Sequence, residues 1–141
     1  MIDRSADGVL YWDTSAVLSV LFEDKHTPSA TEELTDSRVH LMSSLAWSEA
    51  HAVMGRLRRD GAQTEAWLAA ALDMLGHGPW QRITAFPDWE IVRVMASRWP
   101  LRGADLWHLA MSKTLQRDLP ELRMVTYDAA LSRAAEHEGL A

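Results

Sequence analysis

Four acidic residues, Asp13, Glu49, Asp105 and Asp128, stand at the starts or ends of predicted secondary-structure elements. They lie too far apart in the sequence to form a local metal-binding loop, so only the fold could bring them together. Like charges at close range raise each other's pKa and repel unless a cation lies between them. Ligand sets made only of oxygen suit Mg²⁺ or Mn²⁺, ions that support phosphoryl-transfer chemistry. The four carboxylates therefore predict a divalent-metal site, provided that the fold gathers them.

The elements that must position these carboxylates alternate between strands and helices. Short apolar runs predict strands over residues 9–12, 39–42, 81–84 and 123–126. Helical spacing, capping residues and Gly or Pro stops predict helices over residues 14–22, 27–36, 44–60, 63–76, 88–99, 105–117 and 128–137. This alternation indicates an α/β fold with a mainly parallel sheet.

An open α/β sheet binds its ligands beyond the carboxyl ends of its strands. Asp13 and Asp128 each follow a predicted strand, so they share one edge if those strands are neighbours. Glu49 lies on the helix after the second strand. Asp105 falls in the first turn of its helix, where the helix dipole favours an anion. The sequence therefore predicts that the four side chains meet at this edge.

Each of the four acids also has a purely structural explanation. Asp13 and Asp105 could be helix N-caps, and Asp128 could be a turn residue. Glu49 falls in a helical row predicted to face inward, where a carboxylate needs a cation or an arginine partner such as Arg56; this row is Leu45, Glu49, Ala52, Val53 and Arg56. These alternatives stay open for each residue alone, and the prediction of a site depends on the set of four.

Composition limits the class of protein. A length of 141 residues with 48% hydrophobic residues predicts one domain, over residues 1–141, with a sizeable core. The lack of cysteine excludes disulfides, cysteine-ligated zinc and thiol catalysis. No apolar run is long enough for a transmembrane helix, and the first seven residues lack the pattern of a signal peptide. We therefore expect a cytoplasmic protein with no membrane association.

Charged and aromatic residues add weaker signals. The net charge of −6 argues against a broad nucleic-acid-binding surface but allows local basic patches. Candidates are Arg56, Arg58 and Arg59, and Arg98 with Arg102, and a solvated helix face explains each cluster equally well. The six histidines show no metal-ligand spacing, so a catalytic histidine is not expected.

Trp12 and Trp107 are expected in the core or in the wall of a pocket. The other helical tryptophans could pack in the core, bury a partner or stack on unpaired bases, with core or interface favoured; these are Trp47, Trp67, Trp89 and Trp99.

Around the four acids the chain resembles the PIN-domain nucleases, in particular the VapC-like toxins of bacterial type II toxin–antitoxin pairs. The stretches that carry the resemblance are Leu-Tyr-Trp-Asp-Thr-Ser-Ala at 10–16, Ser-Glu-Ala at 48–50, Gly-Ala-Asp-Leu-Trp-His-Leu-Ala at 103–110 and Val-Thr-Tyr-Asp-Ala-Ala-Leu at 125–131. Their order and spacing match over nearly the whole chain. Departures are Trp107, where a smaller residue is commoner, and the early end of the chain, which leaves a closing edge strand in question.

The resemblance implies a three-layer α/β/α fold with a central sheet of four or five strands. It implies a Mg²⁺- or Mn²⁺-dependent endoribonuclease toxin, a cognate antitoxin, a homodimer and a groove for an antitoxin helix or a dimer face at residues 44–75. Asp13, Glu49, Asp105 and Asp128 fall on the acidic positions that bind metal and catalyse, and Thr14, Ser15 and Thr126 fall on supporting hydroxyl positions. Two alternatives stay open: a PIN-like scaffold that binds metal or nucleic acid without cutting, and a nuclease acting on DNA. A phosphoacceptor signalling module is disfavoured, because residues 81–86 contain no Asp.

Overall fold

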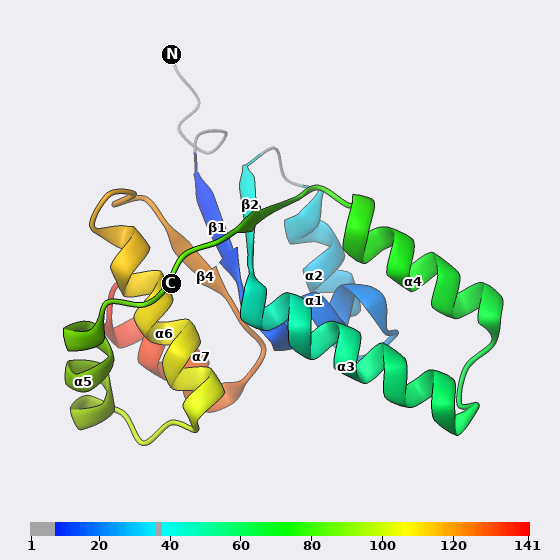
Figure 1. Cartoon of the computed structure of the whole chain (residues 1–141). Coiled ribbons are helices and arrows are strands. Elements are labelled where there is room, and N and C mark those ends of the chain that lie inside the picture. The colour runs from blue at the N-terminus through cyan, green and yellow to red at the C-terminus, as the bar shows by residue number, and fades with distance from the viewer. Residues whose placement is uncertain (1–7, 36–37) are drawn as a thin grey trace, which may run out of the picture.

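The structure is a computed structural model that describes residues 8–35 and 38–141. In that part of the chain the elements are β1 (Val9–Trp12), α1 (Thr14–Leu21), α2 (Thr27–Leu34), β2 (Val39–Ser43), α3 (Ser44–Asp60), α4 (Glu65–His77), β3 (Trp80–Ile83), α5 (Trp89–Arg98), α6 (Gly103–Gln116), β4 (Arg123–Val125) and α7 (Ala129–His137) (Figure 1). Every predicted strand and helix is present, with its ends shifted by at most two residues. The expectation about a signal peptide at residues 1–7 and the predicted helix end at Asp36 fall outside the described residues.

The described strands form one parallel sheet in the order β3-β2-β1-β4. β1 lies in the interior of the sheet, and its last residue, Trp12, pairs with Met42 of β2 and Val125 of β4. Because the strands are parallel, the loops that follow β1, β2 and β4 all leave from the same edge. This topology confirms the predicted parallel sheet and makes β1 and β4 the neighbours that a shared site requires.

Two hydrophobic cores, one on each face of the sheet, produce the three layers. Successive side chains of a strand point to opposite faces, so Leu10 and Trp12 belong to one core and Val9 and Tyr11 to the other. Helices α1 to α4 contribute to the first core and α5 to α7 to the second, on opposite sides of the strands in Figure 1. The expected α/β/α architecture is confirmed.

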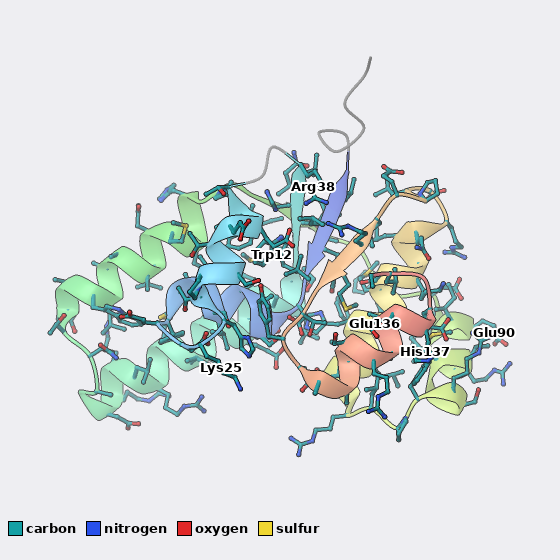
Figure 2. All side chains as sticks on the ribbon, turned by 180° about the vertical axis from the view of Figure 1, so that it is seen from behind. Trp12, Lys25, Arg38, Glu90, Glu136 and His137 are labelled. Atoms are coloured by element: carbon teal, nitrogen blue, oxygen red, sulfur yellow. The ribbon has the colours of Figure 1, made fainter. Side chains whose placement is uncertain are left out.

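Trp12 is fully buried, as predicted, among the layers. Its indole Nε1 donates to His40 Nδ1 at 3.1 Å, and its ring meets Trp80 edge to face. Figure 2 shows Trp12 enclosed by the surrounding elements, whereas Lys25 and Glu90 lie at the exposed surface.

Helices α3 and α4 pair into a hairpin that projects from the sheet, which we call the helical arm (Figure 1). Gly61 ends α3 in the left-handed conformation, at φ +63°, which favours glycine. The buried side of α3 consists of Ala46, Ala50 and Met54, where small side chains let α3 approach α1 closely. The predicted inward row was therefore wrong: its members are half-buried or exposed, namely Leu45, Glu49, Ala52, Val53 and Arg56.

The outer edge of β4 is met by the end of the chain. Met124 donates its backbone N–H to the Leu140 carbonyl at 2.7 Å, and the Leu140 side chain is buried. The described residues thus contain no fifth strand. This single hydrogen bond lies at the sheet edge where a closing strand was in question.

Across residues 8–35 and 38–141, no helix combines the length and the apolar character needed to cross a membrane.

Candidate functional site

The carboxyl edge of the sheet brings together side chains from four segments of the chain. Asp13 follows β1 and caps α1, and Asp128 follows β4 and caps α7. Asp105 lies in the first turn of α6, and Glu49 lies on the second turn of α3. The structural explanation thus holds in part for Asp13 and Asp128, which are N-caps. It does not hold for Asp105, because Arg102 occupies the N-cap position of α6.

Asp13 is the most firmly held member of this site, because hydrogen bonds reach both of its oxygens. Its side chain is buried, Oδ1 accepts from the Ala16 backbone N–H at 2.9 Å, and Oδ2 accepts from the Thr126 hydroxyl at 2.6 Å. The Ser15 hydroxyl lies 2.8 and 2.9 Å from the two oxygens and accepts from the Tyr127 backbone N–H at 3.1 Å. Two of the expected supporting hydroxyls therefore hold this carboxylate and join the β1–α1 and β4–α7 loops.

The four carboxylates act on one another electrostatically. Burial raises the pKa of Asp13 to about 6 against the hydrogen bonds that lower it, and the charge of Asp105 adds to the increase. The pKa of Asp105 is raised by partial burial and then by the charges of Asp128 and Glu49, while Arg102 acts in the opposite direction. Asp105 is therefore the member that these interactions share: it is acted on by Asp128 and Glu49, and it acts on Asp13. A set of oxygens whose negative charges are not neutralised by their surroundings fits a hard divalent cation.

A shallow pocket of about 320 Å³ opens beside Asp105 and Asp128, and it is lined further by Pro100, Leu101, Arg102 and Ala130. Within residues 8–35 and 38–141, no three side chains of His, Asp or Glu stand close enough to hold a metal ion as they are placed. The structure thus brings the acids to one edge and into one electrostatic group but does not preform a closed ligand cage.

A directed chain of hydrogen bonds runs through His108 and ends on Glu49. Tyr11 Oη lies 2.7 Å from His108 Nδ1, and Thr14 Oγ1 lies 3.0 Å from His108 Nε2. Thr14 donates its only hydroxyl proton to Glu49 Oε1 at 2.6 Å, so it accepts from Nε2–H of the imidazole. Nδ1 is then the acceptor for the Tyr11 hydroxyl, and the ring is neutral. Burial, which lowers the pKa of His108 to about 4, favours the same state.

Sequence reasoning missed His108 and Tyr11. The available signal was spacing: His108 lies one turn after Asp105 and therefore on the same side of α6, and Tyr11 lies in a buried strand two residues before Asp13. Glu49 has Thr14 and His108 as neighbours in place of the suggested Arg56, with His108 Nε2 at 3.8 Å. Trp107 packs edge to face on His108, at 5.7 Å between ring centroids, and helps to wall this network.

Replacing His108 by Leu is expected to destabilise the fold by about 2 kcal/mol, because the buried Tyr11 hydroxyl loses its acceptor. Urea unfolding at neutral pH measures the change. In the double variant with Tyr11→Phe, the two losses should not add, because the orphaned hydroxyl is gone. Additive losses would contradict the hydrogen bond between these side chains.

The two buried titrating groups are expected to shift stability with pH in opposite directions. His108 has a folded-state pKa of about 4 against an ordinary 6.5, so the unfolded chain binds more protons and stability falls as pH drops from 6.5 towards 4. Asp13 has a folded-state pKa of about 6 against 3.8, so the folded state binds more protons and stability falls as pH rises through this range.

Single variants should expose these opposing effects in metal-free urea titrations. As pH rises from 4.5 to 7, the free energy of unfolding of Asp13→Asn should increase by about 2 kcal/mol relative to that of the wild type. Over the same range, the free energy of unfolding of His108→Leu should decrease by about 2 kcal/mol relative to that of the wild type. Differences that do not change with pH would contradict the burial of these charges.

Comparison with protein families and known structures places this arrangement among known proteins. The PIN domain matches residues 10–137. The crystal structure of the Mycobacterium tuberculosis toxin VapC20, which cleaves the Sarcin-Ricin loop, superposes with a TM-score of 0.55 at 15% identity, covering 89% of this chain and 94% of that one. VapBC2 from Rickettsia felis, bound to a promoter DNA fragment, gives a TM-score of 0.53 at 12% identity, covering 85% and 99%. A comparison with curated proteins found no match.

At these identities the two structures are evidence of a shared fold, and the family match covers most of the chain. The resemblance noted from the sequence, to PIN domains with a VapC-like fold, is confirmed. The chain with acidic side chains gathered at the carboxyl edge of its parallel sheet belongs to the PIN domain family.

Proposed function

We propose that this PIN-domain protein, a single domain over residues 1–141, is a metal-dependent endoribonuclease and the toxin of a cytoplasmic toxin–antitoxin pair. The observation that carries the proposal is the grouping of the four acids around Asp105, whose pKa is raised by partial burial and then by the charges of Asp128 and Glu49. Acids that lay far apart and served only as caps would not raise one another's pKa. A group of mutually repelling carboxylates beside an open pocket gains stability when a cation binds.

Asp13, Asp105, Asp128 and Glu49 would hold Mg²⁺ or Mn²⁺, directly or through water, because all four offer carboxylate oxygens at one edge of the sheet. When bound, such an ion lowers the pKa of a coordinated water and offsets charge that develops on a phosphate. The absence of a closed cage in the described residues is compatible with ligation completed by water, which Mg²⁺ commonly retains.

The chain's own residues orient the groups that act on the substrate. Ser15 and Thr126 fix both oxygens of Asp13, so this carboxylate keeps one orientation. Thr14 occupies Glu49 Oε1, which leaves Oε2 to accept a hydrogen bond from the attacking water. The neutral His108 fixes the direction of the Thr14 hydroxyl and thereby acts as a positioning residue.

RNA is the proposed substrate because VapC20, which shares this fold, is described as cleaving the Sarcin-Ricin loop. The chemistry of the site does not itself select ribose, so a DNA nuclease and a non-cutting scaffold are the competing functions. Purified protein incubated with Mg²⁺ and matched RNA and DNA strands separates the three. We expect cleavage of RNA, no cleavage of DNA, and equal activity of the control Asp118→Asn, which removes one exposed acid away from the pocket.

The chemistry of the new ends tests the mechanism. Attack by water leaves a hydroxyl and a phosphate monoester, whereas attack by the ribose 2′-hydroxyl leaves a cyclic phosphate. Mass spectrometry of a short cleaved RNA should show the first pair of ends. Cyclic phosphate would contradict the assignment of water as the nucleophile.

The proposed protein partners are a cognate antitoxin and a second copy of the chain. VapBC2, which shares this fold and is described as bound to a DNA fragment from its promoter, supports an antitoxin for this chain too. The helical arm is the proposed antitoxin surface, since it projects from the sheet and exposes Met74 on α4. Expression of the chain alone should arrest growth, and co-expression of the protein encoded beside it should relieve the arrest. Relief by that partner without binding to the chain would argue against this assignment.

A further inference from the structure

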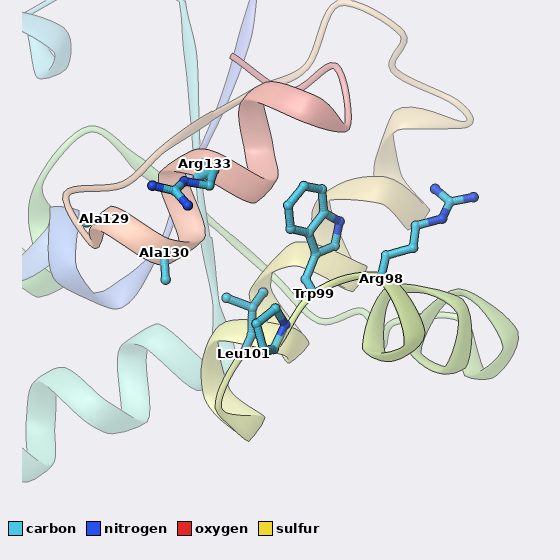
Figure 3. A pocket seen from close by; sticks show the side chains of 7 residues that line it. Arg98, Trp99, Leu101, Ala129, Ala130 and Arg133 are labelled. Atoms are coloured by element: carbon cyan, nitrogen blue, oxygen red, sulfur yellow. The ribbon is translucent and has the colours of Figure 1, made fainter.

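A second pocket of about 420 Å³ adjoins the acidic pocket and has a different character. It lies between the start of α7 and the segment that follows α5 (Figure 3), and its lining residues are Arg98, Trp99, Pro100, Leu101, Ala129, Ala130 and Arg133. Pro100, Leu101 and Ala130 also line the pocket that contains Asp105 and Asp128. The two hollows therefore share part of their walls and lie next to each other along this segment.

The Trp99 ring forms a fixed wall of this second pocket. Its Nε1 donates to Glu138 Oε2 at 2.9 Å, and its ring lies 5.5 Å from that of His137. Glu138 is itself held by Arg98 at 3.0 Å. These contacts hold the indole in place at the side of the cavity while Trp99 stays only half-buried. The rest of the lining combines the apolar side chains of proline, leucine and alanine with those of Arg98 and Arg133.

Positive charge stands at both hollows. Arg133 projects beside the second pocket in Figure 3, and Arg102 lines the acidic one. In residues 8–35 and 38–141, no carboxylate lies within ion-pair distance of either guanidinium, although the charge of Arg102 does act to lower the pKa of Asp105. In a chain of net charge −6, two such arginines beside an apolar slot complement a ligand that is both flat and anionic.

We propose that the pocket at Trp99 binds an unpaired base of the RNA, next to the phosphate that is cleaved at the acidic pocket. An aromatic ring at the wall of an apolar slot matches the π-face of a base, and an arginine beside it matches the backbone phosphate. Because the two hollows share Pro100, Leu101 and Ala130, one strand would place its base in one hollow and the adjacent phosphate in the other. This inference rests on the proposed function in one respect, namely that the bound strand is the RNA that the protein cleaves.

The test measures RNA binding as well as cleavage. Ala129 is exposed at the start of α7 and lines only the Trp99 pocket, so Ala129→Leu fills the slot without disturbing the core. Ala70→Leu makes the same change on the exposed side of α4, in the helical arm, and is the matched control. Trp99→Phe keeps an aromatic wall, whereas Trp99→Ala removes it. Fluorescence anisotropy with labelled single-stranded homopolymer RNAs, in EDTA so that no metal-dependent cleavage occurs, gives the Kd.

Ala129→Leu and Trp99→Ala should raise the Kd at least about fivefold, as expected for the loss of one stacked base, while Trp99→Phe and Ala70→Leu stay within about twofold of the wild type. A strand with one abasic nucleotide beside the mapped cleavage site should bind the wild type more weakly. Ala129→Leu should not weaken the binding of this abasic strand any further, because the strand has no base that the leucine could displace from the slot.

Arg133→Gln should weaken binding to every strand equally and reduce its salt dependence, whereas Arg93→Gln, an equal charge change on the exposed face of α5, should not. If RNA is bound and cleaved but the slot variants bind like the wild type, the pocket proposal is overturned and the nuclease proposal stands. Binding that depends on the slot, without any cleavage, would support the pocket and overturn the nuclease proposal. Failure to bind any RNA overturns both.

Discussion

Asp13→Asn is expected to lose RNA cleavage by at least about 1,000-fold while the protein stays folded. The amide keeps the shape of the side chain, and its oxygen can still accept from the Ala16 N–H at the start of α1. What it loses is the negative charge and the paired acceptors that Ser15 and Thr126 fix. Rates of cleavage under single-turnover conditions measure the effect, with Asp118→Asn as the control of equal charge.

Stability provides the second half of this prediction. Burial raises the pKa of Asp13 to about 6, so the ionised group destabilises the metal-free fold at neutral pH. Asp13→Asn should therefore melt at the same temperature as the wild type or higher, in EDTA. An inactive variant that also melts lower would indicate that Asp13 serves mainly as a helix cap. Full activity in a folded variant would remove Asp13 from the site.

Removal of divalent ions is expected to lower cleavage to the background rate, and added Mg²⁺ or Mn²⁺ to restore it. The same ions should raise the melting temperature of the wild type, because they bind the folded carboxylates and offset their repulsion. A protonated carboxylate is a poor ligand, and the pKa of Asp13 is about 6. The thermal stabilisation by Mn²⁺ should thus be larger at pH 7.5 than at pH 5.

Variants separate this binding from nonspecific ion effects. Asp105→Asn should abolish most of the Mn²⁺-dependent stabilisation, since Asp105 is the acid that senses Asp128 and Glu49. Asp118→Asn should keep it. Equal stabilisation of both variants would mean that the ion binds elsewhere on the protein, and cleavage that persists in EDTA would contradict metal dependence altogether.

The parallel sheet and the placement of three of the acids could be read from local sequence, because strand–helix junctions carry local signals. Asp13 and Asp128 cap helices directly after strands, and capping is a property of a few consecutive residues. Asp105 lies in the first turn of α6, where the dipole made an acid reasonable. Once the strands are parallel, these junctions share an edge without further information.

The orientation of α3 could not be read in the same way. Its periodicity allows more than one inward face, and the row through Glu49, which contains Leu45 and Val53, is one of them. The structure buries the alanine row at Ala46 and Ala50 instead, since α1 packs closely there. Which side of a helix is buried depends on the shape of its neighbour, and that shape is encoded elsewhere in the chain.

His108 illustrates a second limit of sequence reasoning. A histidine among apolar residues of α6 gives no sign of its partners, which come from β1 and α1 about ninety residues away. Its hydrogen bonds to Tyr11 and Thr14 exist only because β1 packs against α6. Long-range polar contacts of this kind require coordinates.

The interior strand β1 carries a polar contact on each face, and this arrangement bears on how the sheet finds its alignment. Tyr11 meets His108 in one layer, and Trp12 meets His40 in the other. A slip of β1 by one residue would exchange the phenol and the indole between the two layers, leaving each imidazole opposite a side chain of the wrong size and polarity. A one-residue shift of β1 would therefore break both hydrogen bonds at once, one on each face of the sheet, so the two histidines favour the native register.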